Sequence, residues 1–504
     1  MINFRKIFTL QIVILTIFSA NISAQHRGDN LSFQGLSTQN EYGVRVSSMG
    51  GAGVSLLGDL SAIFYNPAGL TGIKSLQVSV SANSSNFGWR ENQDYRPNRL
   101  FATLPFYLEG LYIPDPADDG VFDHERLWTD DQQIDSSYVV TDPKLGLDPF
   151  SEEAADWKHD ISNFSVSDIS VAMPFELEGN NFVVGLGYHQ SISIEDFDRN
   201  DTYLDPHIGY FGYGEIGKVN GVDTLDVNWY KFLREKSGSV NSINFALGYE
   251  VMKEINVGVG FKYFWGNSDD KQALDHFGKF SLIDENRFKF YHKNQLLQSS
   301  GSSDYSYMKM NIGALVNLEK ITFGINIDLP YTITRDWSYS TTLTDSNGTV
   351  NSSTSGSDEL SIPIGFSAGL TFLPVDNFSL SLAIENKQFA DAEFSLANND
   401  STHRNWSNQL IFRVGTEYEA IPGLYLRAGY KLIPEVFIPD GAAIKDEGPT
   451  AKSYSFGAGY DLFMGTINVA YEIRELRYYD SYYSNTNYVT QSYENISFGY
   501  TIKF

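Results

Sequence analysis

Apolar and polar residues alternate one by one in many short stretches of this chain, from Leu76 to the last residue, Phe504. In the final stretch every second residue is apolar, namely Ile496, Phe498, Tyr500, Ile502 and Phe504. Side chains on a β-strand point alternately to its two faces, so each stretch predicts a strand with one apolar and one polar face. A soluble β-sandwich accounts poorly for a whole chain of such strands.

Fourteen strands of about ten to twelve residues are predicted, close to the length that a tilted membrane strand needs. They start near Leu76, Ser167, Asn181, Val240, Ile255, Tyr305, Ile321, Glu359, Asn377, Asn408, Gly423, Ala451, Gly465 and Tyr493. Six connections are short, around 178–180, 252–254, 318–320, 374–376, 421–422 and 463–464. The other seven are long, and short and long connections alternate without exception. This order predicts an all-β fold, a 14-stranded antiparallel transmembrane barrel with both chain ends at the side of the short turns.

The alternation also predicts which face of each strand meets lipid. In the strand from Ile321, the side chains of Phe323, Ile325 and Ile327 share a face opposite Asn326. In two later strands, charged residues such as Arg427, Lys431 and Glu472 oppose an apolar face. An arginine at the lipid face of the bilayer midplane costs about 2–4 kcal/mol, so these charges are predicted to face the lumen.

One stretch imitates an enzyme motif. Gly365–Gly369 matches the pattern around the nucleophilic serine of some hydrolases. That chemistry needs a sharp turn from a strand into a helix. Here the five residues lie inside a predicted strand, in which Ile362, Ile364, Phe366, Ala368 and Leu370 are expected to face lipid. We therefore predict no enzyme and no cofactor. We also predict no metal site, because an acidic run, 196–201, fails the calcium-loop pattern at its glycine and glutamate positions.

The first residues predict export. Arg5 and Lys6 precede an apolar run, 7–18, and Ser23-Ala24 form a small-residue cleavage site before Gln25. This is the pattern of a secretory signal peptide over residues 1–24. The chain has no cysteine, a net charge of -26 and 66 residues of Tyr plus Phe (31 and 35). Such acidity argues against nucleic acid as a partner, and the whole set of properties favours the outer membrane of a Gram-negative bacterium.

Residues 25–75 lack the alternation and are rich in small residues. They contain Gly50-Gly51-Ala52-Gly53 and, further on, Asp59 and Asn66-Pro67-Ala68-Gly69. Small residues allow close approach of the backbone, and Asn-Pro begins a tight turn or helix. A barrel of fourteen strands is too wide for its side chains alone to fill, so it needs a plug or leaves a channel. We expect residues 25–75 to be that plug and residues 76–504 to be the barrel with its long outer loops.

With these motifs, the chain resembles the FadL family of outer-membrane transporters (the OmpP1/FadL/TodX group). The resemblance rests on the glycine-rich stretch, Asp59, the Asn-Pro-Ala triplet, the strand count and the terminal Phe504. It implies an N-terminal hatch that contains Gly50, Gly51, Gly53 and 66–69. It also implies a lateral gap beside a kinked third strand, for which Gly185, Gly187 and His189 are candidates because they share the lumenal face. Glycines that merely make room for the hatch explain Gly185 and Gly187 equally well.

The function that this resemblance implies is passive uptake of hydrophobic small molecules, such as long-chain fatty acids, aromatic hydrocarbons or haem. Aromatic residues of the predicted loops are candidates for an entry groove: Phe101, Phe106, Tyr107, Trp128, Tyr210, Phe211 and Tyr213. A monomer in contact with membrane lipid and lipopolysaccharide is expected. Two other functions stay open: a FadL-like component of a protein secretion system that binds exported proteins, and a general diffusion porin.

Overall fold

The computed structural model describes residues 30–93, 144, 146–208, 218–219, 222–223, 225–284, 287–398, 406–439, 448–481 and 486–504. The predicted signal peptide, 1–24, lies outside these ranges. So do all seven aromatic residues of the predicted entry groove, which are Phe101, Phe106, Tyr107, Trp128, Tyr210, Phe211 and Tyr213.

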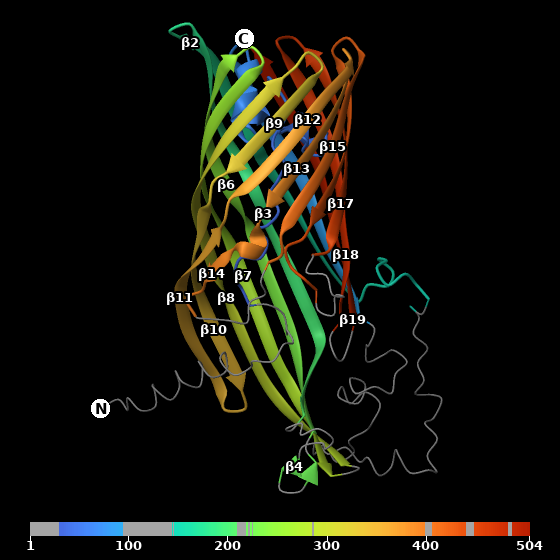
Figure 1. The fold of residues 1–504 in the computed structure, drawn as a ribbon. Helices are drawn as coiled ribbons and strands as arrows, with labels where there is room; N and C mark the ends of the chain where they lie inside the picture. The colour runs from blue at the N-terminus through green and yellow to red at the C-terminus, as the bar shows by residue number, and fades with distance from the viewer. Residues whose placement is uncertain are drawn as a thin grey trace, which may run out of the picture.

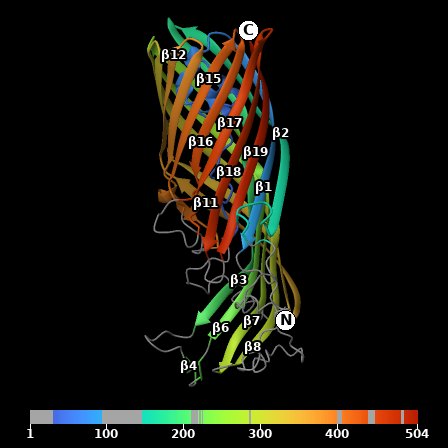
Figure 2. The same ribbon diagram turned by 90° about the vertical axis from the view of Figure 1, so that its right-hand side faces the viewer.

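Seventeen strands pair into one closed antiparallel sheet (Figures 1 and 2). In chain order they are β1 (Gln77–Gln93), β2 (Trp157–Leu177), β3 (Asn180–Ile208), β6 (Leu225–Met252), β7 (Ile255–Asp284), β8 (Arg287–Asn317), β9 (Ile321–Asp328), β10 (Tyr331–Asp345), β11 (Gly348–Ile362), β12 (Gly365–Val375), β13 (Phe378–Lys387), β14 (Glu393–Ser395), β15 (Gln409–Ile421), β16 (Leu424–Pro434), β17 (Thr450–Leu462), β18 (Gly465–Ser481) and β19 (Thr486–Lys503). A separate small hairpin pairs β4 (Lys218–Val219) with β5 (Val222–Asp223).

These strands make a wall of fourteen. β9 continues into β10 and β11 into β12 after short breaks, and β14 only adds three residues beside β11. The barrel closes where β1 pairs with β19, from Gln77 opposite Lys503 to Gln93 opposite Asn487. All six predicted short turns join consecutive wall strands, and Phe504 lies at the same end of the barrel (Figure 1). The predicted fold class is confirmed.

Several strands are much longer than predicted. β3, β6, β7 and β8 have 29, 28, 30 and 31 residues, so they run far beyond the barrel on the side opposite the short turns (Figure 2). Segments expected to be long loops, such as the one before Tyr305, are therefore mostly strand. Water touches both faces of a strand outside the membrane, so its sequence needs no apolar face and shows no alternation.

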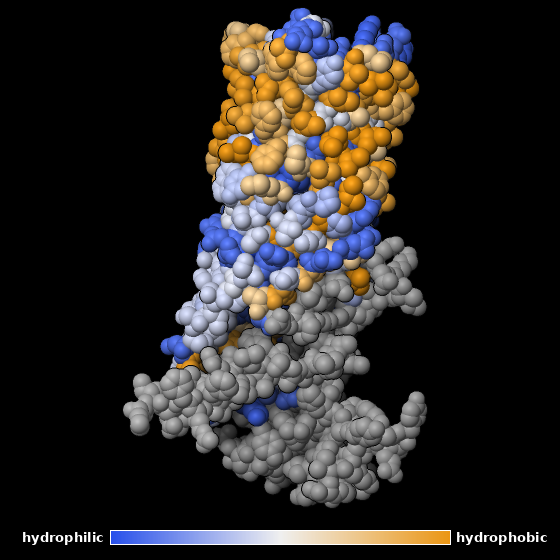
Figure 3. All heavy atoms as spheres, turned by 60° about the vertical axis from the view of Figure 1, so that its left-hand side comes forward, coloured by the Kyte–Doolittle hydropathy of each residue, from blue (hydrophilic) through white to orange (hydrophobic). Residues whose placement is uncertain are grey.

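The predicted faces are found in the barrel half near the short turns. Phe323, Ile325 and Ile327 of β9 point outward, whereas Arg427 of β16 and Glu472 of β18 are buried inside. Figure 3 shows apolar residues gathered over this half and hydrophilic ones beyond it. No helix among the described residues is long and apolar enough to cross a membrane.

The prediction that Ile362 faces lipid is wrong. Its side chain is buried inside the barrel, whereas Ile364 and Phe366 on the same wall strand are exposed. Pro363 lies between β11 and β12, and Pro330 lies at the matching break between β9 and β10. Proline cannot donate to the ladder. The two ladders end at the pair Asp328 and Gly365 and start again at the pair Tyr331 and Ile362, so two residues of each strand between them are not paired with each other. Across this break, the residues that face inward change from odd to even numbers or the reverse.

The N-terminal residues 30–75 contain only short helical turns: α2 (Val44–Ser47), η1 (Leu60–Ile63) and η2 (Pro67–Gly72). A fourth turn, η5 (Phe389–Asp391), follows β13. Helical turns α2, η1 and η2 contact the inner sides of β1, β2, β3, β6, β7, β8, β17, β18 and β19. Residues 30–75, the N-terminal segment, thus lie inside the barrel, with their helical turns in the half that carries the short turns (Figure 1).

Candidate functional site

Asn66, Pro67 and Ala68 anchor the N-terminal segment against the wall. The Asn66 side-chain oxygen caps η2 by accepting from the Ala68 amide (3.2 Å), and Pro67 begins the turn. The Asn66 side-chain nitrogen donates to the carbonyls of Val54 (2.9 Å) and of Ala314 on β8 (3.2 Å). One buried side chain therefore fixes the turn, folds the segment on itself and joins it to the barrel.

The four glycines singled out in the segment lie where a side chain has no room. A Cβ on Gly50 would lie 3.0 Å from the Tyr430 amide nitrogen, and one on Gly51 would lie 2.3 Å from the Glu41 carboxylate. The nearest atoms to a Cβ on Gly53 and on Gly69 are a Tyr65 ring carbon (2.7 Å) and the Leu56 carbonyl oxygen (2.4 Å). Gly50 and Gly51 also have positive φ angles of 66° and 78°, which favour glycine.

The wall has matching glycines on its inner face. Gly185 and Gly187 of β3 face Ile63 and Phe64, at 2.7 and 2.6 Å from a built Cβ. Both glycines lie where β3 pairs with β2 on one side and with β6 on the other. His189 is the last residue of β3 that pairs with β2. The buried His189 ring lies against Tyr42 of the segment, with ring centroids 4.2 Å apart. The structure thus brings Gly185, Gly187 and His189 together at the segment.

Enlarging one wall glycine should expel the segment without harming the barrel. A Cβ on Gly429 of β16 would lie 2.1 Å from the Gly50 nitrogen. We expect Gly429→Val to form the barrel, because valine suits a strand, but to leave the segment open to protease. Ala428→Val is the matched control, since Ala428 is the preceding residue and is exposed on the outer face. The measurement is limited proteolysis of the folded protein, and equal resistance of the two variants would contradict the close docking.

Ion pairs tie the segment to the opposite wall. The Glu41 carboxylate accepts from Lys431 Nζ (2.9 Å) and the Tyr65 hydroxyl (2.5 Å) and lies 3.7 Å from Arg413 Nε. Burial by itself raises the pKa of Glu41, but Lys431, Arg413 and the Tyr65 hydroxyl together bring the pKa down to about 2. The group is therefore charged at any physiological pH. Removing one partner of such a buried pair typically costs about 3–5 kcal/mol.

A second set of ion pairs lies nearer the short turns. Arg45 of the segment donates to both oxygens of Glu417 on β15 (2.9 and 2.7 Å) and to Asp59 (3.0 Å). Burial opposes ionisation of Asp59, but the Arg45 charge and the Ser61 hydrogen bonds lower its pKa. The Asp59 carboxylate also accepts from the Ser61 amide and so caps η1. Arg45 therefore joins α2 both to the wall, through Glu417, and to the start of η1, through Asp59.

The inner wall changes from charged to apolar at one level. On β7, β8, β15 and β16, a cation and an apolar residue follow each other at successive inward positions, with the cation nearer the short turns. The pairs are Lys262 and Phe264, Lys309 and Tyr307, Arg413 and Ile411, and Lys431 and Ile433. Several of these cations form ion pairs with carboxylates, for example Lys309 with Asp328 (2.8 Å) and Arg413 with Glu385 (2.8 Å).

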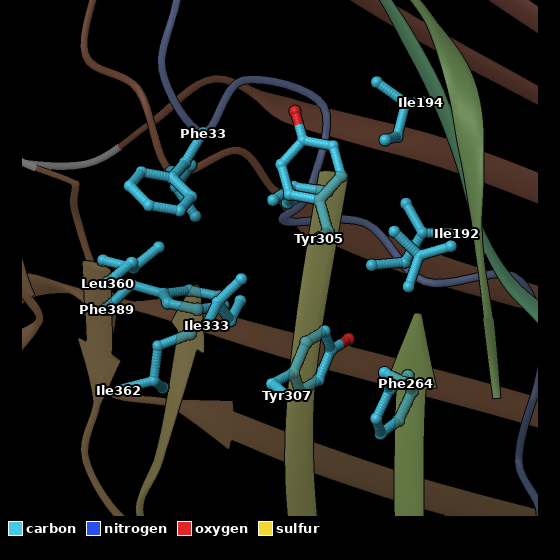
Figure 4. Packing of buried hydrophobic residues seen from close by; sticks show 13 residues of the cluster. Phe33, Ile192, Ile194, Phe264, Tyr305, Tyr307, Ile333, Leu360, Ile362 and Phe389 are labelled. Carbon is cyan, nitrogen blue, oxygen red and sulfur yellow. The ribbon is translucent and has the colours of Figure 1, made fainter. Parts of the chain in front are cut away.

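Beyond the charged level lies a cluster of buried apolar side chains, the apolar cluster (Figure 4). It joins Phe33 and Leu36 of the segment to residues of β3, β6, β7, β8, β10 and β11, with Phe389 and Val436. The wall residues are Ile192, Ile194, Val240, Phe264, Tyr305, Tyr307, Ile333, Leu360 and Ile362. Sequence reasoning missed this cluster. The available signal covered only part of it: Phe264 and Tyr307 each follow or precede a cation at the neighbouring inward position.

Cavities lie on both sides of the segment. An outer cavity of about 170 Å³ opens beside Gly35, Phe394, Trp406 and Phe437. Two cavities of about 250 and 300 Å³ lie toward the short turns, both beside Arg45 and Glu417. Between them, the voids around Glu41 and His189 hold only about 50 and 20 Å³, which is room for a few water molecules. The segment therefore divides the lumen.

The wall is open in its backbone between β2 and β3. Their ladder ends at Asp168 opposite His189, although both strands continue toward the long loops. The segment takes over one part of the lost pairing, because the Asn40 amide donates to the Ser191 carbonyl (2.8 Å) and its side chain to the Gln190 carbonyl (2.9 Å). We call this opening the β2–β3 seam.

Side chains, not backbone, bridge the rest of the seam. Asn163 of β2 donates to Glu195 of β3 (2.9 Å), and the ring centroids of His159 and Phe197 lie 4.1 Å apart. The Arg199 guanidinium lies 5.0 Å from the Trp157 ring centroid. Such contacts exchange more easily than a paired ladder, so the wall opens more easily at the seam than where its strands are paired.

Asp196, in the acidic run weighed for calcium, lies on a strand and has a cationic partner. Arg234 of β6 lies 2.7 Å from Asp196 and 3.5 Å from Asp198. No group of three or more His, Cys, Asp or Glu residues suited to a metal ion occurs within the described ranges. Gly365–Gly369 forms part of β12 rather than a turn into a helix.

Comparison with solved structures shows what the architecture is. A FadL homologue of Pseudomonas aeruginosa matches with a TM-score of 0.58 and 13% identity over 93% of this chain and 99% of that chain. The chain has the FadL fold. The toluene transporter TodX of P. putida matches with a TM-score of 0.54 and 12% identity, over 92% of this chain and 99% of that one. The toluene transporter TbuX of Ralstonia pickettii matches with a TM-score of 0.51 and 13% identity, over 92% of this chain and 98% of that one.

Comparisons of the sequence alone say less about the chain than the comparison of structures. A family model described as a putative MetA-pathway of phenol degradation matches residues 121–282, about a third of the chain. No sequence of a curated protein matches. A closed antiparallel barrel with an even number of strands and an apolar outer band is the architecture of bacterial outer-membrane proteins. The chain is therefore a β-barrel of a Gram-negative outer membrane.

Proposed function

We propose that this protein lets apolar small molecules diffuse passively across the outer membrane, with the N-terminal segment as a hatch. The observation that carries the proposal is the apolar cluster, which lies on the inner wall just beyond the charged level. Water-filled porins have polar interiors, whereas sites for apolar ligands are lined by hydrophobic and aromatic side chains. Phe33 and Leu36 of the hatch pack against the apolar wall residues in this structure, so an entering molecule takes their place.

The proposed route leads from the outer cavity to the apolar cluster and out through the β2–β3 seam. Straight passage toward the short turns would bring an apolar molecule past the charged level around Glu41, Arg413 and Lys431. Ions there need their partners and their water, so an apolar molecule gains nothing by entering. The seam instead leads sideways into lipid. Hatch movement that releases Asn40 from β3 would widen it.

Small aromatic hydrocarbons are the cargo that we propose first, with long-chain fatty acids as the second candidate. The solved channels TodX and TbuX are named toluene transporters, and the matching family model is named for phenol degradation. Aromatic side chains line much of the outer cavity. Its described lining also carries five carboxylates but only two guanidinium groups, Arg234 and Arg474, which disfavours an anionic head group.

Locking the seam should stop lateral release but not entry. The chain has no native cysteine, so Asn163→Cys with Glu195→Cys gives one defined pair across the seam. We expect a reducible cross-linker between them to abolish transfer of toluene from outside into the bilayer of proteoliposomes, and reduction to restore it. Binding of toluene should persist throughout. Each single variant, capped at its thiol, serves as control, and full transfer through the locked protein would refute the lateral route.

A further inference from the structure

β11 is the last strand of the sheet that extends beyond the barrel, and half of it has a free edge. On one side it pairs with β10, from Asp345 opposite Gly348 to Tyr331 opposite Ile362. On the other side only Glu359–Ser361 pair, with β14, and Ala397 donates to the Asp358 carboxylate (2.9 Å). Residues 348–355, the β11 edge, are mostly exposed on both faces and have no second strand among the described residues.

Within the described part of the chain, the β11 edge lacks the features that normally protect such a strand. Exposed edges in monomeric proteins are blunted by charged side chains, proline, a bulge or a covering loop. The edge reads Gly-Thr-Val-Asn-Ser-Ser-Thr-Ser, without charge or proline, and its pairing with β10 has no register shift. Along these eight residues, every second residue points its backbone N–H and C=O to the free side, so the edge presents a template about 26 Å long.

A second copy of this chain does not fit the β11 edge. Two copies in one membrane are related by an axis along the membrane normal. Their β11 strands then run in the same direction and present the same edge, so amide faces amide and carbonyl faces carbonyl at equal height. Like groups that face each other at equal height cannot form the hydrogen bonds of a parallel ladder. Antiparallel pairing would need one of the two copies to be inverted in the membrane.

We propose that the β11 edge binds an extended segment of another polypeptide by β-strand addition on the outer side of the membrane. Main-chain hydrogen bonds supply the affinity in this mode, and the alternate side chains supply the selectivity. The charged side chains on β11 and on its partner β10 that reach solvent near the edge are acidic: Asp336 and Glu359 are exposed, and Asp345 is partly exposed. The partner segment is therefore uncharged or basic. This function is independent of small-molecule uptake.

The test uses hydrogen exchange of the full chain in detergent, read by mass spectrometry. The probe is an acetylated peptide of four Thr-Val repeats followed by two lysines, and the control is the same peptide with alternate amides methylated. We expect amides of residues 348–355 that exchange freely in the protein alone to be protected at least tenfold by the probe and not by the control. Ser353→Pro and Thr354→Pro complete the test. Successive amides point to opposite sides, so one of the two variants keeps the β10–β11 ladder and loses only the docking edge.

Three results would overturn the proposal. The amides of 348–355 could be protected without any peptide, which would mean that the chain itself or a second copy covers the edge. The methylated peptide could protect them as well as the probe, which would exclude backbone pairing. Protection could also persist in both proline variants.

Discussion

A chain from which residues 30–72 have been removed should conduct ions through a steady open pore in planar bilayers, while the intact chain should stay closed. The reason is the width of a fourteen-stranded barrel, which its own side chains cannot fill. In the intact chain the segment leaves only voids of about 20 and 50 Å³ between the outer and inner cavities. Its removal uncovers the charged inner wall around Lys262, Lys431 and Arg413, which favours water and ions.

Gly429→Val and its control Ala428→Val sharpen this test, because they leave the segment in the chain. Gly429→Val should conduct intermittently, as the displaced segment moves in and out of the lumen, and Ala428→Val should stay closed. A steady current through the intact chain would instead support a general diffusion porin. No current through the deleted chain, once its barrel is shown to be folded, would mean that the wall itself closes the lumen.

Two substitutions in the apolar cluster should change the affinity for toluene in opposite directions. Phe33→Ala removes a fully buried ring of the hatch and leaves an apolar space, and engineered apolar cavities of about 150 Å³ stay dry and bind benzene. We expect tighter binding of toluene and a less stable hatch. Val240→Asn puts an amide in the same cluster, at a cost of about 1–3 kcal/mol when unpaired, so affinity should fall about tenfold or more.

Ser239→Asn is the matched control for Val240→Asn. Ser239 is the preceding residue of β6 and belongs to the outer face, so the same amide there should not alter affinity. The measurement is equilibrium binding of radiolabelled toluene to the purified protein. If the Val240 and Ser239 variants bound equally, or if Phe33→Ala had no effect, the apolar cluster would not be the binding site.

The architecture was predictable because the membrane imposes a period of two on every wall strand that it touches. Ile325 and Phe323 had to face lipid, and Arg427 had to face inward, since the reverse arrangement is costly. Short turns such as 178–179 and 253–254 marked one end of the barrel in the same way. The Asn66 motif stood out because nothing around it alternates.

Other features left no such mark. The outer halves of β10 and β11 touch water on both faces, so their serine- and threonine-rich sequence resembles that of a loop. The breaks at Pro330 and Pro363 lie opposite each other and together turn the side chain of Ile362 inward. Only the pairing of the two wall strands shows that the breaks coincide. The apolar cluster joins Phe33 to Leu360 and Phe389, residues more than 300 positions apart, and no local pattern relates them.

The most direct test of the central claim is a crystal structure of the full chain with 4-bromotoluene, read by the anomalous scattering of bromine. The account predicts a bromine peak inside the barrel, among the side chains of Phe264, Tyr307 and Ile333, with the ring of Phe33 displaced. Bromine found only in the detergent around the barrel would contradict it.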